Sequence, residues 1–276
     1  MRPSVFRGIV RTILFFTWTI LLVPPYLLLF ILGRWIRRPF VSLWHRGVCA
    51  LIGMKVNCHG TPYEGPRVLL AGNHVSYLDI PILASCYDLT FVAKADVASW
   101  PVFGFLAKIA QTAFIERKPS KARQQKIELK QRILNGEHLM IFPEGTSSKG
   151  DCVLPFKSAL FEMVMEDDMR EHCAVQPVTI AFSKTLTGHA LDETTRDNFA
   201  WYGDMTLLPH LWNVFCLKGV QVDVIFHNTA LAADFADRKT LASWAETRVR
   251  GGMDALLNQH ETSDIAAIEE VQFKIS

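Results

Sequence analysis

Short apolar runs alternate with helically spaced apolar residues over most of the chain. Runs bounded by turn-forming residues predict strands at residues 55–59, 67–72, 90–94, 112–116, 139–143, 175–182 and 220–227. Amphipathic spacing between these runs predicts helices at residues 77–86, 101–110, 120–135, 157–166 and 238–258. Strands interleaved with helices indicate an α/β sheet with helices on its faces.

The clearest predicted helix lies at residues 120–135. Ser120 is its expected N-cap, Ile127 and Ile133 are apolar positions among charged residues, and Gly136 follows its C-terminal end. No linker divides the body of the chain into two domains.

The N-terminal segment is apolar enough to enter a membrane. Residues 13–32 carry no charge and would span about 30 Å as a straight helix, roughly the thickness of the hydrocarbon core. Pro24 and Pro25 lie near the middle, where proline disrupts a helix. Arginines flank both ends, so the positive-inside rule gives no orientation. The segment therefore predicts a re-entrant hairpin that breaks at Pro24-Pro25, an interfacial anchor or a single span; a cleaved signal peptide lacks a cleavage site.

Charge indicates which surfaces the protein binds, and cysteine spacing indicates its redox compartment. The formal charge is +2 overall, but residues 1–63 carry +8 and the remainder −6. A basic end beside an apolar segment favours an anionic membrane surface, and the body lacks the basic, aromatic face of a nucleic-acid binder. The six cysteines show no CxxC spacing, so reduced, buried thiols in a cytosolic compartment are expected, without a zinc site.

Polar groups follow three of the predicted strands. His74 and Asp79 follow strand 67–72, Glu116 and Arg117 follow strand 112–116, and Glu144 to Ser147 follow strand 139–143. Ligands of open α/β sheets bind beyond the carboxyl ends of the strands. If these strands are parallel, all three groups meet at one edge.

His74 and Asp79 have the composition of a general-base pair. A carboxylate on one imidazole nitrogen fixes the tautomer and leaves the other nitrogen free to take a proton from a hydroxyl. The sequence has no GxSxG elbow, so the activated hydroxyl is expected on the substrate. Structural interpretations stay open: Ser76-x-x-Asp79 resembles a capping box, Asp79 can be an N-cap with Pro81 in the first turn, and His74 can be a loop histidine.

The other two groups suit an anion. Gly145 permits close backbone approach, and Thr146 to Ser148 offer hydroxyls and amides that can cradle an oxyanion or a phosphate. The guanidinium of Arg117 can bind two phosphate oxygens. The alternatives are an ordinary strand-to-helix turn and a solvated arginine beside Lys118 and Lys121.

Together these stretches resemble the glycerolipid acyltransferase family, typified by 1-acylglycerol-3-phosphate acyltransferase. Its sequence blocks occur here in the family's order over roughly residues 50–230: NHxxxxD at 73–79, FIxR at 114–117, FPEGT-S at 142–147 and VxPV at 175–178, with a PFK-like element at 155–157. Gln111 stands where the family's GxxFIxR block has glycine.

The resemblance implies a fold and a reaction. It implies a mixed, largely parallel sheet flanked by helices over residues 49–276, with a membrane anchor over residues 1–48. His74, oriented by Asp79, would deprotonate a lysolipid hydroxyl that attacks the thioester of acyl-CoA or acyl carrier protein. The expected acceptor is 1-acylglycerol-3-phosphate and the product phosphatidic acid. The implied substrate-binding residues are Asn73, Arg117, Glu144, Gly145, Thr146, Ser147 and Lys157.

The resemblance also implies the setting of the reaction. No metal and no tightly held cofactor is expected, and the partners are membrane lipids and the thioester donor. The enzyme would sit on the inner (plasma) membrane with its catalytic domain on the cytoplasmic face. Nucleic acid is not an expected partner, and the oligomeric state is left open.

Other readings remain. Some bacterial members of the family acylate a lyso-ornithine lipid or another lyso-aminolipid, which has no phosphate; Arg117 would then need a partner such as a carboxylate.

A non-catalytic membrane-binding scaffold is disfavoured by the intact His74, Asp79 and Glu144. A lipid hydrolase would need a nucleophile motif that is missing. The aromatic stretch 200–212 fits either an interfacial surface or a core helix with buried tryptophans.

Overall fold

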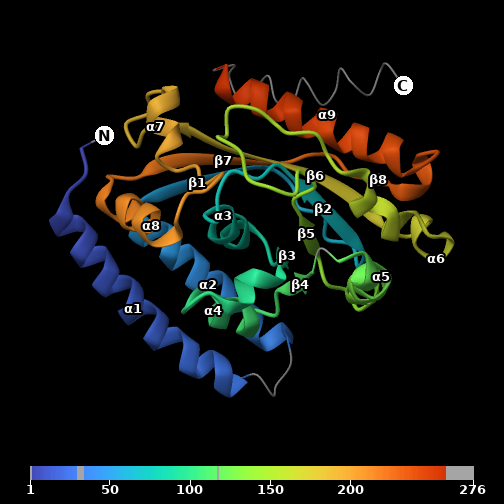
Figure 1. Ribbon diagram of the computed structural model, residues 1–276, viewed down its shortest axis with the longest axis horizontal. Coiled ribbons are helices and arrows are strands. Elements are labelled where there is room, and N and C mark those ends of the chain that lie inside the picture. The colour runs from blue at the N-terminus through green and yellow to red at the C-terminus, as the bar shows by residue number, and fades with distance from the viewer. Residues whose placement is uncertain (1, 30–33, 117, 259–276) are drawn as a thin grey trace.

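A single mixed sheet forms the centre of the computed structural model, which describes residues 2–29, 34–116 and 118–258 (Figure 1). The described strands join in the order β1-β7-β6-β2-β5-β3-β4, with β8 beside β6. Their bounds are β1 Met54–Gly60, β2 Val68–Gly72, β3 Thr90–Lys94, β4 Ala113–Ile115, β5 Leu139–Ile141, β6 Ala174–Lys184, β7 Val220–Phe226 and β8 Ala230–Leu231. The seven expected strands are confirmed, and β8 is additional.

The strand directions bring the predicted groups to one edge. β2 runs parallel to β5 and β6, and β3 runs parallel to β5 and β4. Only β7 and β8 pair with β6 in the antiparallel sense among the described strands. The segments that follow β2, β4 and β5 therefore leave the sheet at the same edge, as expected from parallel pairing.

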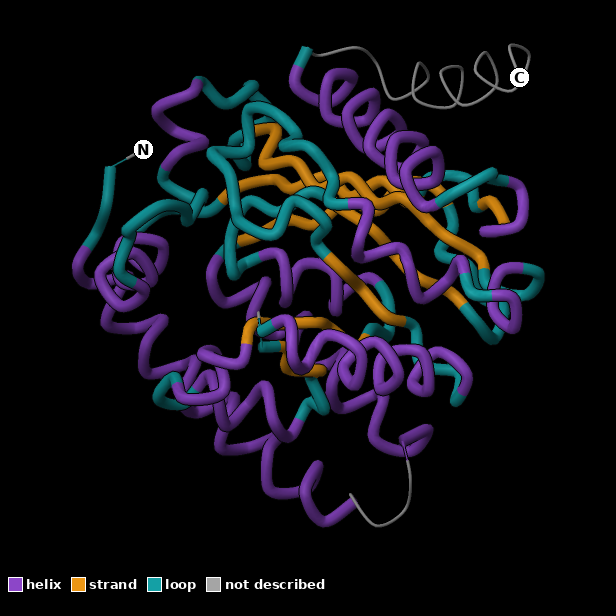
Figure 2. Tube along the Cα trace, turned by 45° about the vertical axis from the view of Figure 1, so that its right-hand side comes forward, coloured by secondary structure: helices purple, strands orange, loops and turns teal. Residues whose placement is uncertain are grey.

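Helices cover both faces of the sheet (Figures 1 and 2). Val68 and Leu70 of β2 face the apolar cluster that includes residues of α2, α3 and α8, whereas Leu69 and Ala71 face the cluster of α5 and α9. The helix bounds are α1 Val5–Leu28, α2 Arg34–Ile52, α3 Asp79–Cys86, α4 Phe103–Ile109, α5 Pro119–Leu134, α6 Asp167–Arg170, α7 Glu193–Asp197, α8 Leu207–Cys216 and α9 Arg238–Leu257, with 3-10 helices η2 Ala95–Ser99, η3 Ser158–Met165 and η4 Ala232–Asp234. A strand that is apolar on both faces is what such a two-sided core requires.

Two details of the predicted helices differ in the structure: residues 158–165 form the 3-10 helix η3, and the N-cap of α5 is not Ser120. Helix α5 has Lys118 as its N-cap and Pro119 in its first turn, where Ser120 was the expected cap. Proline suits this position because its missing N–H would have no partner in the first turn. Ile127 of the same helix is 57% exposed, so Leu129 and Ile133 pack it against the sheet.

Helix α1 runs unbroken through Pro24 and Pro25, so the expected break at these residues is wrong. The two prolines lie near the C-terminal end, where they leave only the carbonyls of Ile20 and Leu21 without their usual helical donors. The N–H of Leu29 bonds to Pro25 O and closes the helix. The chain reverses after Leu28, and α2 then packs beside α1 (Figure 1).

Helix α1 is bonded to the body at its N-terminal end. The backbone N–H of Ser4 donates to Cys216 O at 2.8 Å, and Arg7 donates to the same oxygen at 2.8 Å. Arg11 donates to Leu217 O at 2.7 Å and to Lys218 O at 3.0 Å. Two guanidinium groups thus bind carbonyls at the C-terminal end of α8, where the helix dipole favours positive charge.

The middle and the C-terminal end of α1 also form hydrogen bonds, to α2 and to α4. Trp44 Nε1 donates to Thr19 Oγ1 at 3.1 Å, and the hydroxyl of Tyr26 donates to Ile109 O at 2.6 Å. By length and composition α1 is the one described helix that could cross a membrane. Its outward residues form an exposed apolar stripe: Phe6, Ile9, Ile13, Phe16, Ile20, Leu27 and Leu28.

The stretch 200–212 is not a core helix with buried tryptophans, because Trp212 is exposed and Trp201 is only partly buried. Phe215 at the end of α8 is buried in the core, whereas Leu208 and Trp212 on the same helix are 70% and 41% exposed. Since α1 packs against α8, these exposed side chains belong to the same side of the fold as α1.

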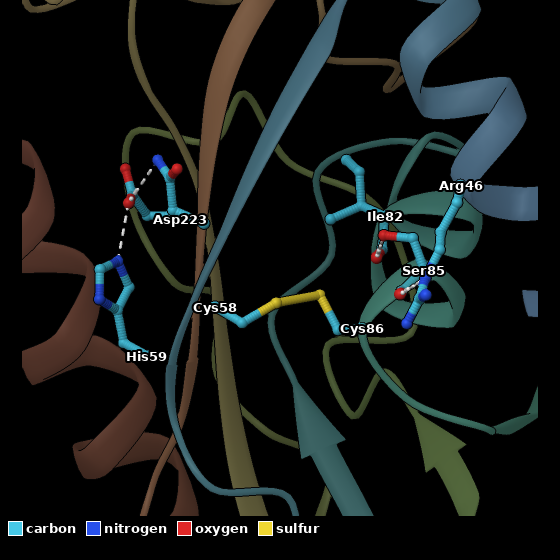
Figure 3. Close-up of a disulfide and its surroundings, with 8 residues drawn as sticks. Arg46, Cys58, His59, Ile82, Ser85, Cys86 and Asp223 are labelled. Carbon is cyan, nitrogen blue, oxygen red and sulfur yellow. Dashed lines mark hydrogen bonds and ion pairs between the residues drawn. A yellow bond between two sulfur atoms is a disulfide. The ribbon is translucent and has the colours of Figure 1, made fainter.

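Two cysteines are joined, contrary to the expectation of reduced thiols throughout. A disulfide links Cys58 of β1 to Cys86 at the end of α3, with Cα atoms 6.7 Å apart (Figure 3). The sheet order places β1 beside α3, a proximity that a separation of 28 residues does not reveal. Cys49, Cys173 and Cys216 are buried free thiols, and Cys152 is exposed.

The attachment of α1 can be tested through Arg11. We expect Arg11→Ala to loosen the N-terminal half of α1 because it removes bonds from a cation to α8 carbonyls, a loss of about 1–3 kcal/mol in local stability. Hydrogen–deuterium exchange should become faster in residues 5–16 and stay unchanged in β2 and β6. Arg2→Ala, at an exposed position, is the control. Unchanged exchange in α1 would contradict this attachment.

Candidate active site

The site begins where β2 ends. Asn73 is fully buried, and its side-chain amide bonds Ile180 of β6 in both directions: Nδ2 donates to Ile180 O at 2.9 Å, and Ile180 N donates to Oδ1 at 2.8 Å. This side chain extends the β2–β6 ladder by one position. The preceding Gly72 is required for the close approach, since a Cβ there would lie 2.7 Å from Val178 O. The polar atoms of the Asn73 side chain thus hold the start of the loop.

One carboxylate oxygen organises the loop that follows. Asp79 Oδ2 accepts from Val75 N at 2.8 Å, from Ser76 N at 3.0 Å and from His74 Nδ1 at 2.7 Å. The Asp79 side chain is completely buried. In a capping box the Ser76 hydroxyl would also accept from the backbone N–H of Asp79, but Ser76 Oγ has no partner. Only the bond from Ser76 N to Asp79 is present, so a capping box does not explain the position of Asp79. The carboxylate therefore fixes both the backbone conformation of the loop and the orientation of the imidazole ring.

The imidazole of His74 is held on its other sides by the FPEGT stretch. Its ring stacks on Phe142, with centroids 4.2 Å apart and planes at 18°. Its backbone N–H donates to Glu144 Oε1 at 3.2 Å, and its carbonyl accepts from Ser148 N at 2.8 Å. The side chain is 22% exposed, and Nδ1 is engaged by Asp79, so Nε2 is the nitrogen available to a substrate.

The turn after β5 is built around Gly145. Its φ of 72° is a conformation that favours glycine, and a Cβ at this position would collide with Lys157 Nζ. Lys157 itself is exposed. Thr146 is exposed, and the hydroxyl of Ser147 donates to Trp201 O. The turn therefore places one lysine beside the site and ties the site to the 200–206 segment.

Glu144 is an unusual carboxyl group. It is 2% exposed, and its Oε2 has no hydrogen-bond partner. Burial raises the pKa of Glu144 to about 8, so the neutral acid dominates at neutral pH.

Most of the residues named from the sequence meet here. His74, Asp79, Glu144, Gly145 and Lys157 lie together, whereas Arg117 lies outside the described residues.

The structure describes the residues on either side of Arg117. Glu116, at the end of β4, pairs with Lys118 at 3.0 Å and with Lys121. Gln111, which replaces the family's glycine, adopts a φ of 63°, so the backbone there keeps a glycine-like conformation.

An apolar cavity of about 220 Å³ adjoins the dyad loop, because Tyr77 and Leu78 line it. Its walls come from α1, α2, α4 and α8 as well as β3. The hydroxyl of Tyr77 shares a hydrogen bond of 2.9 Å with His210 Nδ1. The sequence interpretation missed Phe142 as a stacking partner and Tyr77 as a wall residue, although both lie inside the quoted blocks.

Within the described ranges, no group of three or more histidine, cysteine, aspartate and glutamate side chains is placed to share a metal ion.

The sequence is similar to a family model and to several known proteins. A family model described as Acyltransferase matches residues 55–181. The chain is 37% identical to a lyso-ornithine lipid O-acyltransferase from Brucella abortus, over 86% of this chain and 90% of that relative. It is 32% identical to a 1-acyl-sn-glycerol-3-phosphate acyltransferase from Neisseria gonorrhoeae, over 77% of this chain and 80% of the relative.

A solved structure has the same fold. The 1-acyl-sn-glycerophosphate (LPA) acyltransferase PlsC from Thermotoga maritima superposes with a TM-score of 0.65 at 19% identity, covering 91% of this chain and 96% of that one. The expected largely parallel sheet with flanking helices is thereby confirmed. On the strength of the matching family model and of these relatives, the chain belongs to the acyltransferase family.

Proposed function

We propose that this protein moves a fatty acyl group from a thioester, acyl-CoA or acyl carrier protein, to the free hydroxyl of a lysolipid. The bond of 2.7 Å between His74 Nδ1 and the buried Asp79 carries the proposal, because it leaves Nε2 as the base. Nε2 takes the hydroxyl proton while the oxygen attacks the thioester carbonyl carbon. The carbon–sulfur bond then breaks, and the leaving thiolate takes the proton back from the imidazolium. Asp79 stays ionised throughout and stabilises the imidazolium.

The acceptor proposed here is a lyso-ornithine lipid. Relatives so named, from Brucella abortus and Rhizobium meliloti, share 37% and 35% identity with the chain, against 32% for the 1-acylglycerol-3-phosphate enzyme from Neisseria gonorrhoeae. In such a lipid the headgroup carries a carboxylate, which Lys157 or Arg117 would bind instead of a phosphate. The second candidate is 1-acylglycerol-3-phosphate, the acceptor expected from the sequence blocks, and the Neisseria relative favours it.

The apolar cavity beside Tyr77 is the proposed place for the acyl chain. Tyr77 and Leu78 of the loop that carries His74 line it, and its walls are almost entirely aliphatic and aromatic. Burial of methylene groups in such a cavity contributes about 0.8 kcal/mol each.

Helix α1 is proposed to lie in the membrane surface as part of the anchor over residues 1–48. It is bonded to the body near its start and its end, and to α2 at its middle, which supports a helix lying along the protein over one crossing to the other side. Its exposed apolar stripe would enter the lipid. Since thioester donors are cytosolic, the catalytic domain of residues 49–276 would face the cytoplasm at the inner membrane.

The function is tested with purified protein, palmitoyl-CoA and a panel of lysolipids. Wild type should release free thiol and form product with lyso-ornithine lipid, and His74→Ala should lose at least about 10²–10⁴-fold in turnover because the base is missing. His59→Ala is the matched control, because it removes another histidine bonded to an aspartate, Asp223, at 2.8 Å (Figure 3). This pair lies on β1 and β7, on the far side of β6 from β2.

The panel of lysolipids distinguishes the two candidate acceptors. Acylation of 1-acylglycerol-3-phosphate alone would contradict the proposed acceptor and keep the mechanism. Full turnover by His74→Ala would contradict the mechanism itself.

Asp79→Asn tests the charge of the carboxylate. The amide oxygen can take the place of Oδ2 and still accept from His74 Nδ1, but the negative charge that stabilises the imidazolium is lost, so we expect kcat to fall by about 10²–10⁴-fold with a smaller change in KM. Thermal melts establish that the variant is folded. A change confined to KM would show that Asp79 acts on binding and not on the base.

Glu144→Gln tests the buried neutral acid. Because the folded pKa of Glu144 is raised to about 8, its stabilising contribution is complete below the unfolded pKa and is lost as the pH rises through 8. The variant cannot ionise, so its melting temperature should fall less than that of wild type between pH 6 and pH 9 (roughly one to two units either side of the shifted value). Parallel curves would show that Glu144 is already ionised at pH 6.

A further inference from the structure

The disulfide between Cys58 and Cys86 closes a loop that contains the whole proposed catalytic pair. Residues 58–86 include β2, the turn with His74 and the helix α3, whose first residue is Asp79 and whose last is Cys86. The disulfide therefore joins the far end of the helix that carries the catalytic carboxylate to β1, at the end of the strand order (Figure 3).

The disulfide lies at the surface of the protein. Cys58 is exposed on the edge strand β1, and Cys86 is only partly buried. An exposed disulfide exchanges with dissolved thiols while the protein stays folded, whereas a buried one must first be uncovered by unfolding. Cys58 is thus the residue at which an incoming thiolate is expected to attack.

Helix α3 is short, and its position depends on how its C-terminal end is held. Besides the disulfide, Arg46 Nε donates to Ser85 O at 3.0 Å at that end. Ile82 and Leu83 are completely buried and keep the helix packed on the core. A helix of eight residues is about 12 Å long and moves as a rigid body, so a looser C-terminal end gives its first residue, Asp79, more freedom to move.

We propose that Cys58–Cys86 is a thiol–disulfide exchange site through which a cytosolic dithiol lowers the activity of the enzyme. A thiolate of the dithiol attacks Cys58 Sγ, the S–S bond breaks, and Cys86 leaves as a thiolate that takes a proton. The second thiol of the dithiol then displaces Cys58, which is also protonated. Two electrons pass to the protein, and the dithiol becomes a disulfide.

The inference rests on the proposed function, because that function places the catalytic domain in the cytoplasm. Disulfides of cytosolic proteins are usually transient or redox-sensing, since dithiols of this compartment reduce them. In the reduced protein α3 keeps its apolar packing, but Asp79 is held less firmly against His74, so acyl transfer becomes slower.

The exchange itself is measured on the full chain in detergent, equilibrated with mixtures of reduced and oxidised dithiothreitol. Acid quenching, alkylation and mass spectrometry of the peptides then count the thiols. Both should appear together in the folded protein, and the melting temperature should fall by about 5–15 °C. A disulfide that is reduced only in denaturant, or two thiols that stay free in every oxidising mixture, would overturn the proposal.

The effect on catalysis is measured with palmitoyl-CoA and lyso-ornithine lipid, with the product quantified by mass spectrometry because dithiothreitol interferes with thiol detection. We expect kcat to be about three- to tenfold lower in the reduced protein, with a smaller change in KM, since full misplacement of a catalytic group costs about 10²-fold. Hydrogen–deuterium exchange should become faster in residues 74–86 and stay unchanged in β6. Equal kcat values in the two redox states would overturn the proposal.

Variants assign the response to this pair. The double variant Cys58→Ser/Cys86→Ser should have the kcat of the reduced protein in every mixture. Cys152→Ser is the matched control, because it changes an exposed thiol that forms no disulfide, and it should keep the response. A double variant with the kcat of the oxidised protein, or loss of the response in Cys152→Ser, would contradict the assignment.

The two proposals fail in different ways. Absence of product with every lysolipid in both redox states would overturn the proposed function, and the thiol count would still decide whether Cys58 and Cys86 exchange in the folded protein. Product formed at the same rate in both states would overturn the inference alone.

Discussion

The buried loop after β2 must satisfy its backbone without a neighbouring strand, and the rest of the site follows from how it does so. Two of its amides, from Val75 and Ser76, bond to one oxygen of Asp79. Asn73 replaces the missing strand partner by bonding Ile180 with its side chain. Because the same Asp79 oxygen accepts from His74, a requirement of folding and a requirement of catalysis are met by one carboxylate.

The strand order then supplies the neighbours. β2 lies between β5 and β6, so the segment after β5 reaches His74 from one side and the backbone of β6 reaches Asn73 from the other. The ring of Phe142 and the carboxyl of Glu144 come from one short stretch. β7 runs antiparallel to β6 and β1 runs parallel to β7, so the segments that follow β1 and β7 leave the sheet at the opposite edge from the site. Residues of α1 and α2 line the cavity on the same face of the sheet as α3.

Much of this arrangement can be predicted from sequence, for local reasons. Runs such as residues 68–72 are apolar at every position and identify strands buried on both faces without tertiary information. The spacing of His74 and Asp79 alone left a capping role open, and the resemblance of the NHxxxxD and FPEGT blocks to the family predicted the pair. Features that depend on distant partners were not predictable. Helix α1 bonds to the end of α8 through Arg7 and to α4 through Tyr26, beside its prolines, and Cys58 is linked to Cys86 across β1 and α3.

The account rests on His74 presenting an unprotonated Nε2 to the acceptor hydroxyl, with the proton of the ring held on Nδ1 by Asp79. Nitrogen-15 NMR of the imidazole, assigned by the loss of its signals in His74→Ala, tests this most directly at a pH where the ring is neutral. The account predicts a protonated Nδ1 and an unprotonated Nε2. A ring that carries its proton on Nε2 would contradict it, because that nitrogen could not then accept the proton of the attacking hydroxyl.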